Sequence, residues 1–142
     1  MSQPPNLNLG EGFDARELQV YEAVGEEIFR KLVDVFYERV SADPALAHMF
    51  PPDLTEAKEH QLLFLQQFFG GPKTYLERFG HPRLRMRHLP FVIGMKERDA
   101  WLGHMVASID EVGVSEPWSG VMKRYFERSS LAMMNSGDEN GR

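Results

Sequence analysis

The chain has 142 residues, the size of one domain, and its net charge of −5 argues against a nucleic-acid-binding protein, which usually carries a basic excess. It contains no cysteine, which excludes disulfides, thiolate nucleophiles and every cysteine-ligated metal or iron–sulfur site. A hydrophobic share of 42%, with 10 Phe and 8 Met, is typical of a globular core rich in flat and pliable side chains.

Both ends of the chain are polar. Residues 1–14 are rich in Pro, Asn and Gly, so we expect a disordered extension and no secretory signal. Residues 15–135 are expected to form one domain, and residues 136–142 a disordered tail. The longest dense apolar stretch, residues 62–65, is far shorter than the roughly 20 residues of a membrane span. We therefore expect a cytoplasmic protein with no membrane partner.

Nine prolines divide the chain, because proline breaks a helix interior but suits the first helical turn. In chain order, the pattern predicts helices over about 15–22 and 25–40, a short helical turn over 44–50, a helix from Asp53 to a stop at Gly70, a polar loop over 73–82, and helices over about 83–88, 96–112 and 117–134. No segment alternates with a period of two. The predicted fold class is all-α.

Three side chains with polar groups lie on predicted apolar stripes: Tyr37, Gln61 and Trp101. Gln61 belongs to the third long helix, whose predicted inward stripe is Ala57, Gln61, Phe64, Leu65 and Phe68. A buried amide without a hydrogen bond costs about 1–3 kcal/mol. These three residues therefore indicate either a pocket for a small polar ligand or ordinary core residues whose polar ends find protein partners.

The histidines fall into three groups. His81 lies in a Gly-His-Pro loop and is expected to be structural. His88 lies in the last turn of a short helix, where a free backbone carbonyl can accept the proton of one ring nitrogen and leave the other as a metal ligand. From spacing alone, a ligand and a surface histidine both remain open for His88. The histidines expected on the surface are His48, His60 and His104.

Five motifs in unbroken order, within roughly residues 20–135, resemble the group II truncated haemoglobins. They are FYERV at 36–40, FPPDL at 50–54, FGGP at 69–72, GHPRLRMRHLPF at 80–91 and DAWL at 99–102. The resemblance implies a truncated globin fold, a two-over-two sandwich of helices around one b-type haem (iron protoporphyrin IX). It also implies an oxygen-binding or oxygen-transport protein whose ligands include O2, CO and NO.

The resemblance also implies roles for individual residues. His88 matches the proximal iron ligand, and Tyr37, Gln61 and Trp101 match positions that line the distal side, where a diatomic ligand binds. Arg87 and Tyr75 are expected to reach a haem propionate. The implied apolar wall consists of Phe50, Phe64, Leu84, Phe91 and Met105. Ala57 stands where vertebrate globins have a histidine gate, and Phe50 stands where some members have a second distal tyrosine.

Distal donors of this kind predict high O2 affinity with slow release, which suits scavenging, sensing or redox chemistry better than delivery. One alternative is haem-dependent peroxidase or NO dioxygenase activity supported by an unidentified reductase. Another alternative is a haem-free helical binding module for an apolar ligand. The oligomeric state is not predicted.

Overall fold

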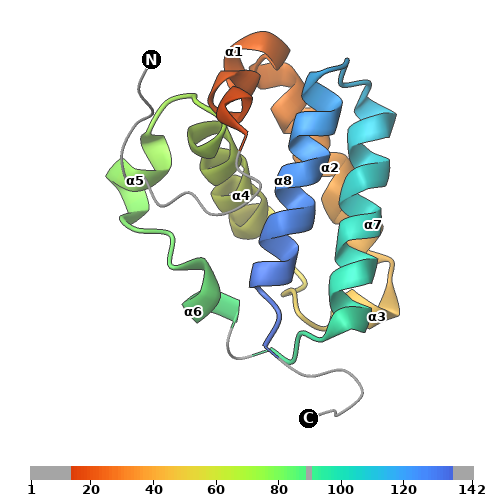
Figure 1. Cartoon of the computed structure of the whole chain (residues 1–142). Helices are drawn as coiled ribbons and strands as arrows, with labels where there is room; N and C mark the ends of the chain where they lie inside the picture. The colour runs from red at the N-terminus through yellow and green to blue at the C-terminus, as the bar shows by residue number, and fades with distance from the viewer. Residues whose placement is uncertain (1–13, 89–90, 136–142) are drawn as a thin grey trace.

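In this computed structural model, the described residues are 14–88 and 91–135, and within them every regular element is helical (Figure 1). In chain order these are the 3-10 helix η1 (Ala15–Gln19) and the α-helices α1 (Val20–Val24), α2 (Glu26–Ser41), α3 (Pro44–Ala47), α4 (Thr55–Phe68), α5 (Thr74–Phe79), α6 (Leu84–His88), α7 (Met95–Val112) and α8 (Trp118–Ala132). The predicted all-α class is confirmed. The predicted disordered extension and tail fall almost wholly outside the described residues and stay predictions.

Local sequence signals explain several helix ends. The Asp43 carboxylate accepts a hydrogen bond from the backbone N–H of Ala45 at 2.9 Å and so caps α3. The Asp53 carboxylate likewise accepts from the N–H of Thr55 at 3.0 Å, although α4 begins at Thr55, two residues later than predicted. After α4, Gly70 has a φ of 97°, and a Cβ there would collide with the backbone carbonyl of Leu18.

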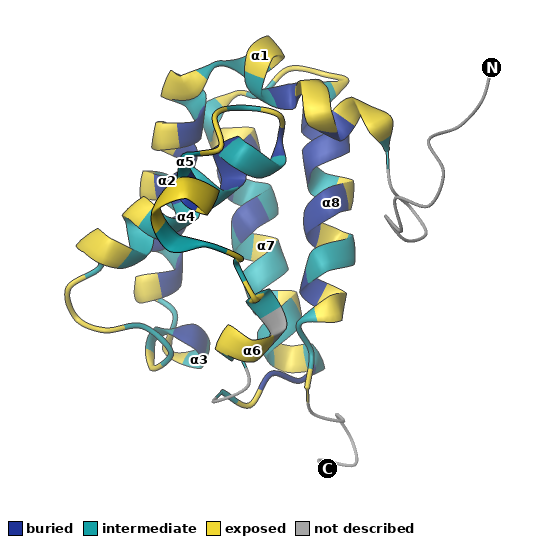
Figure 2. Ribbon diagram, turned by 90° about the vertical axis from the view of Figure 1, so that its left-hand side faces the viewer, coloured by how far each residue is buried: buried dark blue, intermediate teal, exposed yellow. Residues whose placement is uncertain are grey.

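The four long helices form two pairs. α2 packs against both α4 and α7, and α7 packs against α8, so that α2 joins the two pairs. Figure 1 shows α7 and α8 side by side, with the short helices α5 and α6 beyond α4. Figure 2 shows a buried face on α8 and only exposed or intermediate positions on the part of α6 that is described. None of the helices in residues 14–88 and 91–135 has both the length and the apolar character of a membrane span.

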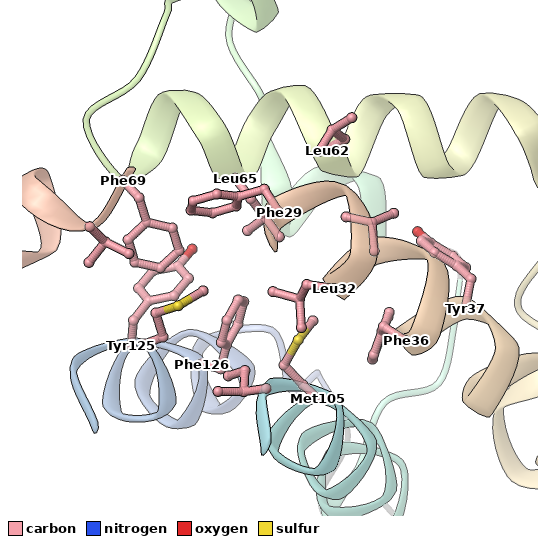
Figure 3. Packing of buried hydrophobic residues seen from close by; sticks show 14 of the residues in the cluster. Phe29, Leu32, Phe36, Tyr37, Leu62, Leu65, Phe69, Met105, Tyr125 and Phe126 are labelled. Atoms are coloured by element: carbon pink, nitrogen blue, oxygen red, sulfur yellow. The ribbon is translucent and has the colours of Figure 1, made fainter. Parts of the chain in front are cut away.

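Aromatic rings from α2, α8 and the end of α4 fill the centre of the core (Figure 3). Phe69 is fully buried, and its ring centroid lies 5.9 Å from that of Phe29 and 5.3 Å from that of Tyr125. The Phe126 ring centroid is 6.1 Å from the Phe69 centroid. Pairs in this range of distances add about 0.5–1.5 kcal/mol each to ordinary burial. Phe69 therefore connects the end of α4 to both helix pairs.

The predicted loop over 73–82 is wrong, because residues 74–79 form α5. The segment is polar by composition, yet Tyr75 is buried, with only 3% of its surface exposed. The side-chain carbonyl of Gln67 accepts from the N–H of Leu76 at 2.8 Å, and Arg78 forms a 2.7 Å ion pair with Glu59 of α4. Contacts with α4 stabilise a helix too short to be predicted from its own sequence.

Of the residues predicted to face inward on α4, only Leu65 is fully buried. The other buried residues of the helix are Leu62 and Gln66, whereas the remaining members of the predicted stripe are half-buried. α4 therefore has two apolar faces. One face packs in the core, and the other lines a cavity.

The packing of Phe69 predicts that Phe69→Ala lowers the free energy of unfolding by about 3–5 kcal/mol, because the ring leaves a void among side chains from three helices. Urea unfolding of the same preparation measures the loss. As a control, Leu76→Ala, at a side chain that is 49% exposed, is expected to change stability by less than about 0.5 kcal/mol. Equal losses in the two variants would contradict the assignment of Phe69 to the core.

Candidate functional site

A cavity of about 540 Å³ lies beside the second face of α4, within the size range of small-molecule and cofactor sites. Its walls come from α2, α3, α4, α5, α6, α7 and α8 and from the segments after α3, α6 and α8. The predicted site residues that line it are Tyr37, Phe50, Gln61, Phe64, Tyr75, Leu84, Arg87, His88, Phe91 and Trp101. Residues far apart in sequence thus meet at one site.

Met105 was expected in the apolar wall, but it lies in the core instead. Its side chain is fully buried, and Figure 3 shows it among the core residues, near Leu32 and Phe126. Trp101 is one turn earlier on the same face of α7 and does line the cavity. The cavity extends along the first half of α7 only, and core side chains fill the space beyond it.

His88 is the last residue of α6, and its ring is held by its own helix. The ring nitrogen Nδ1 lies 2.7 Å from the backbone carbonyl oxygen of Leu84. A carbonyl oxygen only accepts hydrogen bonds, so Nδ1 carries the proton and donates it. The other ring nitrogen, Nε2, therefore keeps a free lone pair, on a residue that lines the cavity.

Two polar groups in the apolar wall, on Tyr37 and Gln61, have incomplete hydrogen bonding. The Tyr37 hydroxyl donates to the backbone carbonyl of Ala57, but the distance of 3.4 Å makes this a weak bond. The buried side-chain oxygen of Gln61 has no partner in the structure. An unsatisfied buried polar atom costs about 1–3 kcal/mol, so its presence in a cavity wall points to a ligand.

Ring packing fixes Trp101 and Tyr37 in position. The Trp101 ring meets Phe36 edge-on at 5.1 Å between centroids and lies 5.8 Å from Phe126. Tyr37 meets Phe50 edge-on at 5.6 Å. Burial also raises the pKa of the Tyr37 phenol well above its ordinary value, so the hydroxyl stays protonated and remains a donor.

Arg87 and Tyr75 both line the cavity but differ in their exposure to solvent. Arg87 is exposed, and its Nε donates to the backbone carbonyl of Pro82 at 2.7 Å, which leaves the terminal guanidinium nitrogens for other acceptors. Tyr75 is buried, and its ring packs edge-on against Phe64 at 5.8 Å. Their expected contacts with a propionate stay predictions.

Sequence reasoning missed several lining residues. α8 contributes Tyr125, whose pKa is raised to about 12 by burial, and also Ser129. Neither residue is among the site residues expected from the sequence. His60 was expected on the surface, but it is half-buried, lines the cavity and stacks on Phe79 at 4.0 Å. Its spacing of three from Ala57 and four from Phe64 is the signal that could have placed it there.

The other histidines are distributed as follows. His104 was expected on the surface, but it is half-buried, and its Nε2 lies 2.7 Å from the Asp43 carboxylate. His48 is exposed, as expected. His81 accepts a hydrogen bond at Nδ1 from the N–H of Arg83 at 2.9 Å, which supports its expected role in the loop.

Comparison with known proteins agrees with this geometry. The sequence model of the "Bacterial-like globin" family matches residues 19–135. The group 2 truncated hemoglobin YjbI of Bacillus subtilis is 42% identical over 134 residues, covering 94% of this chain and 98% of that protein. The crystal structure of hemoglobin from the thermophilic phototrophic bacterium Chloroflexus aurantiacus has a TM-score of 0.80 at 62% identity, covering 82% of this chain and 97% of that chain. The truncated oxygen-avid haemoglobin from Bacillus subtilis has a TM-score of 0.79 at 46% identity, covering 82% of this chain and 98% of that chain.

Two helix pairs beside a cavity, with one histidine presented to the cavity from a short helix, define a globin. More narrowly, the chain belongs to the bacterial-like globin family and, within it, to the group II truncated haemoglobins. The family and the fold class expected from the motifs are therefore confirmed. Membership implies a haem cofactor and the binding of small diatomic ligands such as O2.

Proposed function

We propose that this protein holds a b-type haem through His88 and binds O2, and also CO and NO, on the side that faces Trp101, Tyr37 and Gln61. The observation that carries the proposal is the 2.7 Å contact between His88 Nδ1 and the Leu84 carbonyl. This contact fixes the tautomer and leaves Nε2 as a ligand atom at the cavity.

The residues present fit a haem. The walls include flat rings from Phe50, Phe64 and Phe91, which suit a planar macrocycle. The chain contains no cysteine, so thioether attachment of the kind found in c-type proteins has no residues to form it, and non-covalent binding follows. The unpartnered oxygen of Gln61 and the weakly bonded hydroxyl of Tyr37 supply polar groups that a ligand can use.

A haem held here would supply an iron able to bind a diatomic ligand in a partly charged form. The role of the protein is to place hydrogen-bond donors where that charge develops. The Trp101 indole N–H and the Tyr37 hydroxyl are donors set in an apolar wall, where electrostatic interactions are stronger than in water. Ring packing orients both groups before the ligand arrives, so little ordering is required on binding.

These donors support tight O2 binding. A hydrogen bond to a charged acceptor is worth about 1.5–3 kcal/mol, which corresponds to about one to two decades in dissociation rate. The structural relative described as oxygen-avid supports the same expectation. Slow release favours O2 scavenging, sensing or redox chemistry over delivery. The cytoplasmic location and a cognate reductase remain part of this proposal.

His88→Gly is expected to abolish tight haem binding, because it removes the Nε2 ligand atom that α6 presents to the cavity. Titration of the apoprotein with haemin, followed by the Soret band, measures the loss. Added imidazole should fill the space left by the side chain and restore the band. The matched control is His81→Ala, which should bind haem like the wild type. If His81→Ala lost the band and His88→Gly kept it, the assignment of His88 would be wrong.

Trp101→Phe is expected to raise the O2 dissociation rate about ten- to a hundredfold, because it removes one donor while keeping an aromatic ring in the wall. Stopped-flow displacement of O2 by CO measures the rate. Trp118→Phe is the matched control, because Trp118 lies at the start of α8 and packs against the core cluster. A rate equal to that of the wild type in Trp101→Phe would rule out the indole as a donor.

Tyr37→Phe is expected to raise the same rate by a smaller factor, because the hydroxyl also bonds the Ala57 carbonyl. Burial raises the pKa of Tyr37, so the folded protein keeps the phenol protonated beyond the ordinary range near pH 10. The wild-type dissociation rate should therefore stay constant between about pH 7 and 10. A rise in this range that disappeared in Tyr37→Phe would contradict the burial of the hydroxyl.

A further inference from the structure

Asn135 bridges the end of α8 and the segment that follows His88. Its side-chain oxygen Oδ1 accepts from the N–H of Ile93 at 2.9 Å, and its Nδ2 donates to the carbonyl oxygens of Phe91 at 2.9 Å and of His88 at 3.2 Å. Its own backbone N–H donates to the Ile93 carbonyl at 2.9 Å. One residue thus holds three positions that lie more than 40 places earlier in the chain.

The chemistry of this contact is specific to an asparagine. Ile93 presents a donor, and His88 and Phe91 present acceptors, so the side chain at 135 must both accept and donate. Only an amide of this length offers both functions side by side. If the amide were flipped, its NH2 group would face the N–H of Ile93 and its oxygen would face the two carbonyl oxygens. The hydrogen bonds therefore define its orientation.

The bridge matters because α6 has little else to hold it. A helix of five residues does not persist on its own, and α6 has no extensive packing against another helix within the described part of the chain. The His88 carbonyl belongs to the last turn of α6, so no N–H group within the helix donates to it. It accepts instead from the N–H of Phe91 at 3.0 Å and from Asn135.

α8 provides the fixed support. Its residues Tyr125 and Phe126 are buried in the core, and the helix ends at Ala132, three residues before Asn135 (Figure 1). Asn135 therefore links the backbone of His88 to a helix whose position is fixed by the core. The ring of His88 is set separately by the Leu84 carbonyl.

We propose that Asn135 is a positioning residue for His88, a role that rests on the proposed function of His88 as the haem ligand. Asn135 sets the distance and tilt of α6 relative to α8, and through them the place of the imidazole. Its side chain is bonded to backbone groups, and Asn135 is not among the residues that line the cavity.

The test replaces Asn135 in the haem-loaded full chain. Asn135→Asp keeps the size of the side chain and the acceptor for Ile93 but removes both donors, and its carboxylate opposes two carbonyl oxygens. Asn135→Ala removes every side-chain contact. Leu131→Ala is the matched control, because Leu131 is in the last turn of α8 with 47% of its surface exposed.

The diagnostic readout is the iron–imidazole stretching band of the ferrous protein in resonance Raman spectra. Both Asn135 variants should shift and broaden this band, with Asp at least as effective as Ala, whereas Leu131→Ala leaves it unchanged. Transfer of haem to an excess of acceptor globin should be at least about tenfold faster in both Asn135 variants, because each loses at least two hydrogen bonds of ordinary strength. The C–O stretch of the CO form, which reports the distal donors, should stay as in the wild type.

An unchanged iron–imidazole band together with a lower melting temperature would overturn the proposal, since Asn135 would then only fasten the end of α8. Loss of helical circular dichroism in Asn135→Asp would also overturn it, because a positioning residue leaves the core folded. Failure of the proposed function has a different signature. In that case the wild type binds no haem, or His88→Gly retains the band without imidazole.

Discussion

The two faces of α4 meet different surroundings, and the rest of the site depends on this asymmetry. Leu62 and Gln66 are buried away from the cavity, whereas Ala57, Gln61 and Phe64 line it. Apolar surface left in contact with water costs about 25 cal/mol for each Å², so such a wall favours any flat apolar occupant. The core thereby creates both the space for a cofactor and the driving force to fill it. Four of the ten Phe residues line this cavity.

The polar groups of the cavity cost stability wherever they lack a hydrogen-bond partner. The Gln61 oxygen is unpartnered, and the Tyr37 hydroxyl reaches its acceptor only at 3.4 Å. A core optimised for stability alone would satisfy both groups or replace them. Their presence in the same cavity as His88 is typical of a site that is arranged before its ligand arrives.

Much of this arrangement was predictable, and the exceptions have physical causes. The Asp43 cap follows from a local signal. Spacing put Tyr37, Gln61 and Trp101 on apolar stripes, and the motifs that identified the family implied their place at the site. The helix α5 was missed because its stability comes from contacts with α4. Met105 was misplaced because periodicity gives the face of a helix but not how far along its axis a cavity extends. Asn135 was missed because its partners become neighbours only after folding.

α8 contributes Tyr125 to the core and to the cavity wall at once, within 5.3 Å of the Phe69 ring. Folding of the chain and binding of a cofactor in the cavity are therefore linked equilibria, because both depend on the same side chains. An occupant that binds only the folded chain stabilises it by about 2.7 kcal/mol when its free concentration is a hundred times its dissociation constant. Substitutions at such shared positions combine non-additively. For this globin, the melting temperature is a measure of cofactor loading as much as of packing.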